Sequence, residues 1–143
     1  NDNKVGGPEI SDTFLSVGAL APEYGPEMVA NFSNYGKTEV DVFSPGVRIY
    51  ATTPNNSYEY LQGTSMASPN AAGVAALIRS YYPELKASEV KQIMMQSGIP
   101  VNMQVTLGGD PNTQRNFSEI SRTGRIVNAY NALIMAEQMS KKK

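Results

Sequence analysis

The sequence of 143 residues contains neither histidine nor cysteine, and these two absences set the first limits on its chemistry. Without cysteine, disulfide bonds and thiolate metal sites are excluded, and the redox compartment is left open. Without histidine, the chain has no side chain whose ordinary pKa suits base catalysis near neutrality. The length is enough for one compact domain with a hydrophobic core, and we assign residues 1–143 to a single domain.

Strong charge and long apolar runs are also lacking. The 12 basic and 13 acidic residues give a net charge of −1, which gives no indication of nucleic-acid binding. The only basic cluster, Lys141–Lys143, is typical of a solvated tail. No apolar run approaches the roughly 18 residues of a membrane span, so no membrane-spanning segment is expected.

The most informative stretch is Gln62–Ile78, where a polar turn leads directly into an apolar segment. Gly63 permits a tight turn, and Ala71–Ile78 is apolar on every side, which predicts a buried helix. Ser65 is then at a helix N-terminus, where unpaired N–H groups and the macrodipole stabilise developing negative charge. On composition alone, Ser65 or Thr64 is more often an N-cap than a catalytic group, so both interpretations stand at this point.

The string Gly63-Thr64-Ser65-Met66-Ala67-Ser68-Pro69 resembles the active-site serine signature of the subtilisin-like serine peptidases, the subtilases. Its fifth position is Ala67, so it differs from the Gly-x-Ser-x-Gly elbow of the α/β-hydrolases. Further stretches follow the order and approximate spacing of that family's C-terminal half: Val17–Ala19, Asn31–Gly36 and Phe43–Val47. The resemblance implies an α/β, three-layer fold with a mostly parallel sheet, and we expect this chain to be its C-terminal part.

The resemblance also implies a role for each residue of the turn. Ser65 is expected to be the nucleophile, with Gly63, Thr64 and Met66 forming the active-site turn around it. Thr64 and the N–H of Ser65 are expected to contribute to the oxyanion hole. The triad of the family runs Asp, His, Ser, and because the chain has no histidine, we expect the other two members upstream of Asn1.

Substrate contacts and two asparagines complete the candidate site. By the same resemblance, Leu61 and Gln62 are expected to bind substrate on the leaving-group side of the cleft. Asn70 occupies a position where many subtilases carry histidine, but this position does not belong to the triad. Asn1 has about the separation from Ser65 expected of the family's oxyanion asparagine. It lacks the preceding small-residue strand, so we interpret it as a loop residue.

Apolar runs and turn residues predict the strands. Thr13–Ala19 is expected to be a strand buried on both faces. Alternation from Val40 to Ile49 indicates two short strands joined by a Pro45–Gly46 turn. A second turn is expected at Gly108–Pro111.

Two more helices are expected after the buried one. The first begins near Ser88 and stops at Gly98, and the second begins at Arg125. The second has apolar residues at helical spacing: Ile126, Tyr130, Leu133 and Ile134. Between them, Asp110 and Glu119 have no ligand pattern around them, so no metal site is assigned.

Together these features predict a serine endopeptidase that cleaves polypeptides through an acyl-enzyme on Ser65. Its expected partner is the N-terminal part of the same domain, and this chain alone is expected to be inactive and to self-associate through unpaired strand edges. Two alternatives stay open: a pseudopeptidase that binds or scaffolds, and a domain that cleaves only itself. No cofactor is expected in this chain, and calcium in the whole protein is left open. The family implies a bacterial-type protein that is secreted or held in the cell envelope.

Overall fold

A four-stranded sheet forms the centre of the structure, a computed structural model that describes residues 12–142. Its strand order is β1 (Val17–Leu20), β2 (Val42–Pro45), β8 (Arg125–Ile126) and β5 (Ile99–Pro100). The pairs β1–β2 and β2–β8 are parallel, and β5 is antiparallel to β8. The predicted fold class, α/β with a mostly parallel sheet, is confirmed. Asn1 lies outside the described residues.

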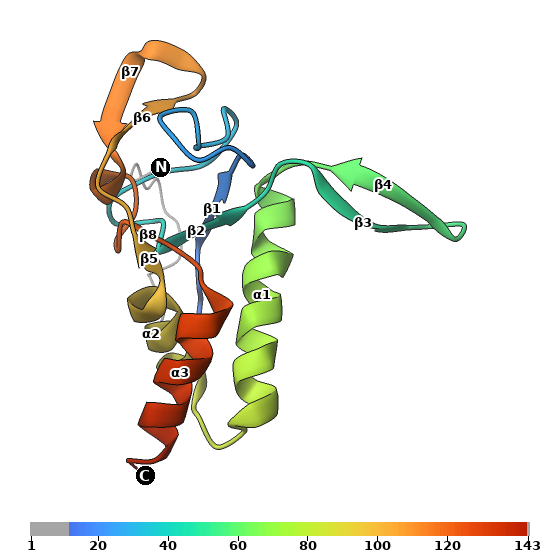
Figure 1. Ribbon diagram of the computed structural model, residues 1–143, viewed down its shortest axis with the longest axis vertical. Helices are drawn as coiled ribbons and strands as arrows, with labels where there is room; N and C mark the ends of the chain where they lie inside the picture. Colours follow the sequence, from blue (N-terminus) through green and yellow to red (C-terminus); the bar gives the residue numbers. More distant parts are fainter. Residues whose placement is uncertain (1–11, 143) are drawn as a thin grey trace, which may run out of the picture.

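Three α-helices pack together at one end of the described chain (Figure 1): α1 (Thr64–Tyr81), α2 (Ala87–Ser97) and α3 (Ala129–Ser140). They share one hydrophobic cluster, to which Ile78 of α1, Ile93 of α2 and Ala136 of α3 belong. Helix α1 also contacts β1 and β2 directly. None of the helices within residues 12–142 is both long and apolar enough to cross a bilayer.

Alternation along β1 explains how the sheet separates two hydrophobic clusters. Val17 and Ala19 pack with the helices, whereas Leu20 belongs to the second cluster on the other side. Gly18 must be small, because a Cβ there would lie 2.4 Å from a ring carbon of Phe43. The ring of Phe43 packs on that of Phe117, with centroids 5.0 Å apart. The packing of Phe43 in the second cluster therefore requires glycine at position 18 of β1.

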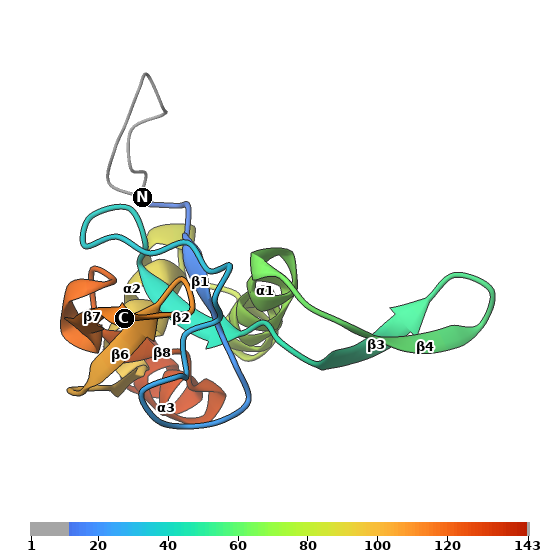
Figure 2. The ribbon, with the colours of Figure 1, turned by 90° about the horizontal axis from the view of Figure 1, so that it is seen from above.

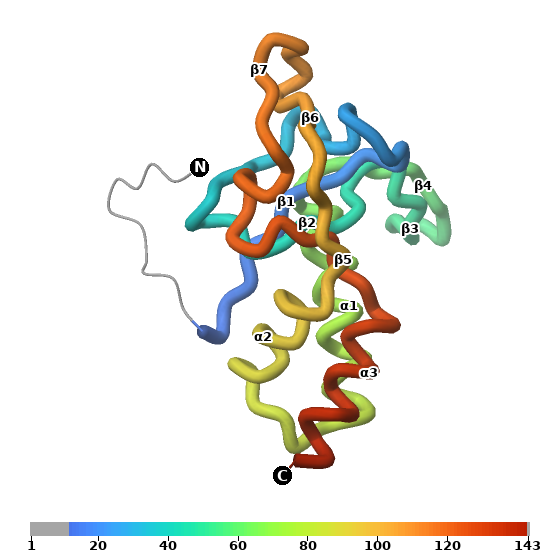
Figure 3. The backbone as a smooth tube through the Cα atoms, turned by 60° about the vertical axis from the view of Figure 1, so that its left-hand side comes forward, coloured from blue at the N-terminus to red at the C-terminus, as the bar shows by residue number. Residues whose placement is uncertain are grey.

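Two antiparallel hairpins extend from this body. The hairpin of β6 (Gln104–Leu107) and β7 (Asp110–Asn116) rises at the end opposite the C-terminus (Figure 3) and leads into a 3-10 turn, η1 (Phe117–Glu119). In Figure 2, β6 and β7 lie on one side of β1 and β2, and α1 lies on the other. The turn predicted at Gly108–Pro111 is confirmed at Gly108 and Gly109, which both have positive φ (62° and 71°), whereas Asp110 and Pro111 already belong to β7.

The second hairpin, β3 (Ile49–Thr53) and β4 (Ser57–Leu61), projects away from the body (Figure 2). Its register pairs Tyr50 with Tyr60, and Tyr58 lies next along the same face. The three rings are exposed, and Tyr50 contacts both others, with its centroid 5.5 Å from that of Tyr58 and 4.9 Å from that of Tyr60. Because β4 ends at Leu61, the hairpin leads directly into the Gln62–Ser65 turn.

A buried ion pair joins distant parts of the chain next to the first residues of β1 and β2. The Lys91 ammonium of α2 lies 3.2 Å from an Asp41 carboxylate oxygen, with side-chain exposures of 7% and 4%. The same carboxylate accepts from the N–H of Ser16 at 3.0 Å and lies 3.6 Å from the Arg122 guanidinium. The backbone carbonyl of Asp41 accepts from the Thr123 hydroxyl at 2.7 Å. Asp41 thus connects the start of β1, α2 and the segment that leads to β8.

Two predicted elements begin elsewhere than expected. The strand predicted for Thr13–Ala19 begins only at Val17, and Phe14 is 66% exposed rather than buried. The helix predicted from Arg125 is wrong at its start, because Arg125–Ile126 is strand β8. Helix α3 starts after Asn128, whose side chain accepts from the N–H of Asn131 at 2.8 Å and caps the helix.

Two predicted helix faces also differ from the structure. Tyr130, placed on the apolar face of the last helix, is 74% exposed, and the fully buried positions are Ala132 and Ala136. The segment Ala71–Ile78 is buried only on one face, because β1, β2 and the other helices cover one side of α1 within residues 12–142. Leu77 faces outward.

The predicted bounds of α2 are confirmed, and α1 extends beyond the apolar segment that predicted it. Helix α1 stops at Tyr81. Helix α2 begins at Ala87 and has Gly98 as its C-cap, and the N–H of Lys86 donates to the Glu89 carboxylate at 2.7 Å. Gly98 is required for space, since a Cβ there would lie 2.6 Å from the carbonyl oxygen of Ile126.

Candidate active site

The predicted serine turn lies where the carboxyl ends of β1 and β2 meet the N-terminus of α1. Ligand sites of open α/β sheets are found at this edge. Ala19 of β1 and Ala67 of α1 are fully buried against each other, and Gly46 follows β2 at the same place. A Cβ on Gly46 would lie 2.7 Å from the Ala19 Cβ and 2.8 Å from the Gly63 carbonyl oxygen. We call these three residues, Ala19, Gly46 and Ala67, the serine seat.

Backbone hydrogen bonds fix the turn on the serine seat. The N–H of Gly63 donates to the Gly46 carbonyl at 2.8 Å. The carbonyl of Gly63 then accepts from the N–H of Met66 at 2.9 Å and of Ala67 at 3.3 Å. Gly63 itself has φ 149° and ψ 161°, a conformation that side chains disfavour. The glycine of the motif is therefore explained by backbone geometry.

Ser65 is the second residue of α1, and its side chain is exposed. The N-cap is Gly63, and the helix has no side-chain cap hydrogen bond. Within residues 12–142, neither the hydroxyl nor the N–H of Ser65 has a hydrogen-bond partner. The structure therefore does not support the N-cap interpretation of Thr64 or Ser65. It leaves a hydroxyl and an N–H group available together at a helix N-terminus.

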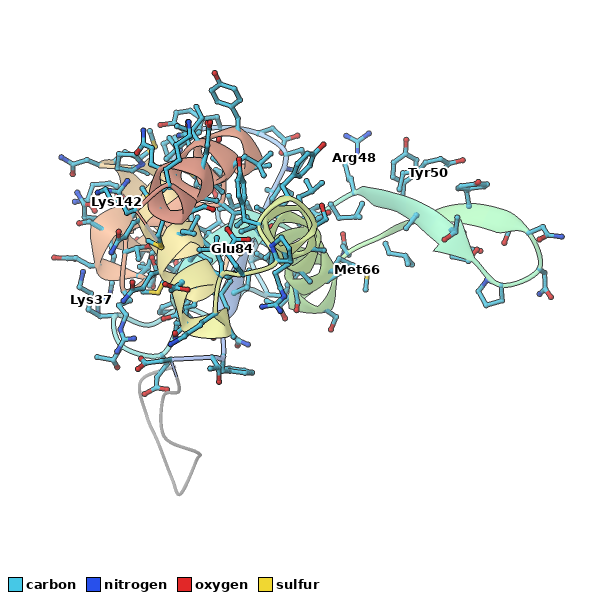
Figure 4. The ribbon with its side chains drawn as sticks, turned by 90° about the horizontal axis from the view of Figure 1, so that it is seen from below. Lys37, Arg48, Tyr50, Met66, Glu84 and Lys142 are labelled. Atoms are coloured by element: carbon cyan, nitrogen blue, oxygen red, sulfur yellow. The ribbon has the colours of Figure 1, made fainter. Side chains whose placement is uncertain are left out.

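The other predicted site residues surround this turn. Thr64 and Met66 are half-buried, and Gln62 is exposed. Leu61 is half-buried and pairs with Ile49 at the root of the β3–β4 hairpin. In Figure 4, Met66 lies near the start of α1, whereas Arg48 and Tyr50 point away on the opposite side of the hairpin. Tyr50 thus points to the side of the hairpin away from Met66.

A hollow of about 390 Å³ lies beside the turn, and we call it the Gln62 hollow. Gln62 forms part of its wall together with Asn31, Phe32 and Val47. The Phe32 side chain is exposed. Sequence reasoning identified Gln62 but not Asn31 or Phe32. The family resemblance includes the loop that carries them, Asn31–Gly36, but its proximity to Gln62 is set by tertiary structure.

Asn70 has a structural role that the sequence did not indicate. Its side-chain amide nitrogen donates to the carbonyl of Pro45, at the end of β2, at 2.9 Å. It also donates to the carbonyl of Met66 at 3.3 Å. The side chain therefore ties the first turns of α1 to the central sheet.

Among residues 12–142, no group of three or more His, Cys, Asp or Glu side chains could hold a metal ion. Asp110, one of the two carboxylates considered in the sequence, uses its oxygens in its own turn. It accepts from the N–H of Asn112 at 2.9 Å and the Thr113 hydroxyl at 3.0 Å. The Asn112 N–H, followed by the Thr113 hydroxyl, lowers the pKa of Asp110 below its ordinary value.

The family comparison agrees with this geometry. The model of the subtilase family matches residues 1–123, so this chain belongs to the subtilase family. Subtilisin DY of Bacillus licheniformis is 46% identical over 91 residues, which are 64% of this chain and 32% of that protein. The major intracellular serine protease of Bacillus subtilis (strain 168) is 40% identical over 108 residues, which are 72% of this chain and 33% of that protein.

A solved structure supports the same fold. The crystal structure of the A-subunit of the AB5 toxin from E. coli superposes with a TM-score of 0.67 at 26% identity. The match covers 85% of this chain and 37% of that one. This chain therefore spans about a third of the length of these relatives.

Proposed function

We propose that this chain carries the nucleophile of a subtilase serine endopeptidase, and that Ser65 is that nucleophile. The observation that carries the proposal is the exposed Ser65 hydroxyl on the second residue of α1, not engaged in capping, within a family member. The hydroxyl oxygen attacks the carbonyl carbon of a peptide bond, and its proton passes to a base. The base returns this proton to the amide nitrogen as the tetrahedral intermediate collapses, so the C–N bond breaks, the amine leaves and an acyl-enzyme stays on Ser65.

The same turn supplies groups for the charge that develops. The N–H of Ser65 and Thr64 stabilise the oxyanion, and the positive end of the α1 dipole adds to this. Gly63 and Met66 hold the turn in shape, and the 2.9 Å hydrogen bond from the Met66 N–H to the Gly63 carbonyl supports this role. Leu61, Gln62 and the Gln62 hollow receive the leaving-group side of an extended polypeptide.

The base and its carboxylate partner come from outside these residues, because the sequence contains no histidine. We propose that the N-terminal part of a subtilase domain supplies both and packs on this chain. Within residues 12–142, strand β1 pairs with β2 on one side, and its C-terminal half contacts Val29 and Ala30 on the other. The start of β1, at Val17, offers the edge for that contact. Alone, the chain is then inactive and prone to self-association, which light scattering on the purified chain tests. A monodisperse monomer at high micromolar concentration would contradict this part.

A fluorophosphonate probe tests the nucleophile directly. In the whole protein the probe modifies Ser65, and Ser65→Ala lowers turnover by a factor on the order of a million. The isolated chain reacts at background level, since no imidazole is present to accept the proton. Near-normal peptidase activity of Ser65→Ala would remove the proposal.

A second candidate stays open beside the first, a pseudopeptidase that uses the fold for binding, because the histidine that a peptidase needs is not in this chain. The two candidates differ in the rest of the protein, where only a peptidase carries the Asp and His of the triad. Peptide hydrolysis by the whole protein, lost in Ser65→Ala, selects the first. Peptide binding without hydrolysis selects the second.

We also propose a secreted or cell-envelope location and no bound cofactor in this chain. Both proposals go beyond membership of the subtilase family. Membership alone does not fix the location, because one relative is named as an intracellular protease. Cell fractionation with an antibody against this chain checks the location.

A further inference from the structure

We propose that Asn70 is a positioning residue that holds Ser65 in register with the central sheet. This inference rests on the proposed function, because it assigns Asn70 a part in placing the nucleophile. Asn70 acts through its hydrogen bonds to the backbone carbonyls of Pro45 and Met66 rather than through the Ser65 hydroxyl.

The hydrogen bonds of Asn70 leave one assignment of its side chain. Its two partners, the carbonyls of Pro45 and Met66, are both acceptors. Only the amide nitrogen has protons, and it has two, so one is available for each carbonyl. The first bond spans 25 positions in the sequence and joins α1 to β2, whereas the second stays within one turn of α1. Asn70 is thus a bridge between an element of the sheet and the start of the helix.

The neighbouring proline explains why a side-chain bridge matters here. Pro69 lies inside α1 and has no N–H, so it cannot donate to the carbonyl of Ser65 four residues earlier. The helix therefore lacks one of the backbone bonds that would hold Ser65 to the following turn. The bond from Asn70 to Pro45 holds this part of the helix from outside, through the sheet.

The serine turn is consequently fastened at both ends to adjacent residues of one strand end. Upstream of Ser65, the N–H of Gly63 donates to the carbonyl of Gly46 at 2.8 Å. Downstream, Asn70 donates to the carbonyl of Pro45 at 2.9 Å. Two successive carbonyls thus bracket residues 63–70, with Ser65 between the two attachments. Loss of the downstream attachment leaves the turn held at one end.

Without the hydrogen bond from Asn70 to Pro45, Ser65 should be placed less accurately for attack, while substrate affinity should be unchanged. A nucleophile displaced by about 1 Å loses about a hundredfold in rate, so a fraction of that shift should lower kcat by about tenfold. The substrate contacts assigned to Leu61 and Gln62 lie upstream of Gly63 and keep their attachment. KM should therefore stay within about twofold of the wild-type value.

The test compares two variants of the whole protein with a matched control. Asn70→Asp keeps the shape but replaces the donor nitrogen with oxygen, which repels both carbonyls. Asn70→Gln keeps the donor on a longer side chain. Asn131→Asp makes the same chemical change on the exposed surface of α3, away from the serine turn. Each protein is measured for kcat and KM, with active sites counted by fluorophosphonate titration and Tm recorded by circular dichroism.

We expect Asn70→Asp to lose about tenfold in kcat per titrated active site, with an unchanged KM. Asn70→Gln should recover part of this loss in kcat. The control Asn131→Asp should have the kcat and KM of the wild-type protein. Wild-type kcat per active site in Asn70→Asp would overturn the inference, even if Tm fell, because the bridge would then serve stability alone. Where Asn70→Asp does not fold, Asn70→Ala gives the same comparison without the added charge. Failure of the probe to label wild-type Ser65 would instead overturn the proposed function, and the inference with it.

Discussion

The buried ammonium of Lys91 makes a sharp prediction about stability. Its partner carboxylate, Asp41, is 4% exposed, and the two charges lie 3.2 Å apart. Lys91→Met keeps most of the side-chain volume but leaves the carboxylate buried without this cation. Removing one partner of a buried pair typically costs about 3–5 kcal/mol, because the remaining charge is desolvated and uncompensated.

Two other contacts of Asp41 set the expected value within that range. The N–H of Ser16 at 3.0 Å and the Arg122 guanidinium at 3.6 Å both remain in Lys91→Met. Arg122 is exposed, so solvent screens its contribution. We therefore expect a loss of about 3 kcal/mol, at the lower end of the range. Urea denaturation of the chain, followed by circular dichroism at several protein concentrations, measures it.

A double-mutant cycle separates the pair from the packing of each side chain. Asp41→Asn alone should also destabilise, and the double variant should cost no more than the worse single one, since no buried charge is left unbalanced. Lys142→Met, which changes an exposed lysine (Figure 4), is the matched control and should change stability by less than about 0.5 kcal/mol. A loss below about 1 kcal/mol in Lys91→Met, or additivity in the cycle, would refute the reasoning.

Two further predictions concern a glycine and a carboxylate. Gly46→Ala places a Cβ 2.8 Å from the Gly63 carbonyl oxygen and should lower the free energy of unfolding by about 1–3 kcal/mol in the same denaturation assay. The control Gly73→Ala has open space around the new Cβ and should stabilise α1. Equal effects of the two substitutions would contradict the close approach at Gly46. Thr113→Val removes one donor to Asp110, so its pKa should rise toward the ordinary 3.8 in an NMR titration, and an unchanged pKa would show that the hydroxyl bond does not act. Since the folded-state pKa is lowered, the stabilisation by Asp110 is present above the ordinary pKa and is lost as the pH falls through the folded-state value, and the variant should lose less on acidification.

Local sequence signals predicted the elements that depend on local geometry. Gly63 precedes the first residue of α1, Gly98 follows the last residue of α2, and Gly108–Gly109 forms a hairpin turn. Each of these positions combines a glycine with a change of apolar pattern, which is the strongest kind of single-sequence signal. The serine turn belongs to this class, and for this reason its geometry could be anticipated.

Features that depend on distant partners were not visible in the sequence. The buried Lys91 pairs with Asp41, which lies 50 positions earlier in the chain. The two residues of β8 are too short to show a period, so their apolar spacing merged with that of α3. Phe32 and Asn70 reach the site through tertiary contacts that periodicity does not encode.

The serine seat restricts how a protein of this kind can diversify. Ala19 and Ala67 have only a methyl group and Gly46 has no side chain, so every substitution at Gly46 and nearly every one at the two alanines adds atoms to a fully packed space. The smallest step open to Gly46 already brings an atom within 2.8 Å of the carbonyl of Gly63. Substitutions are easier to accommodate at the exposed rim, where Gln62 and Phe32 line the Gln62 hollow. New side chains can reshape what the hollow accepts while the support beneath the reactive hydroxyl stays fixed.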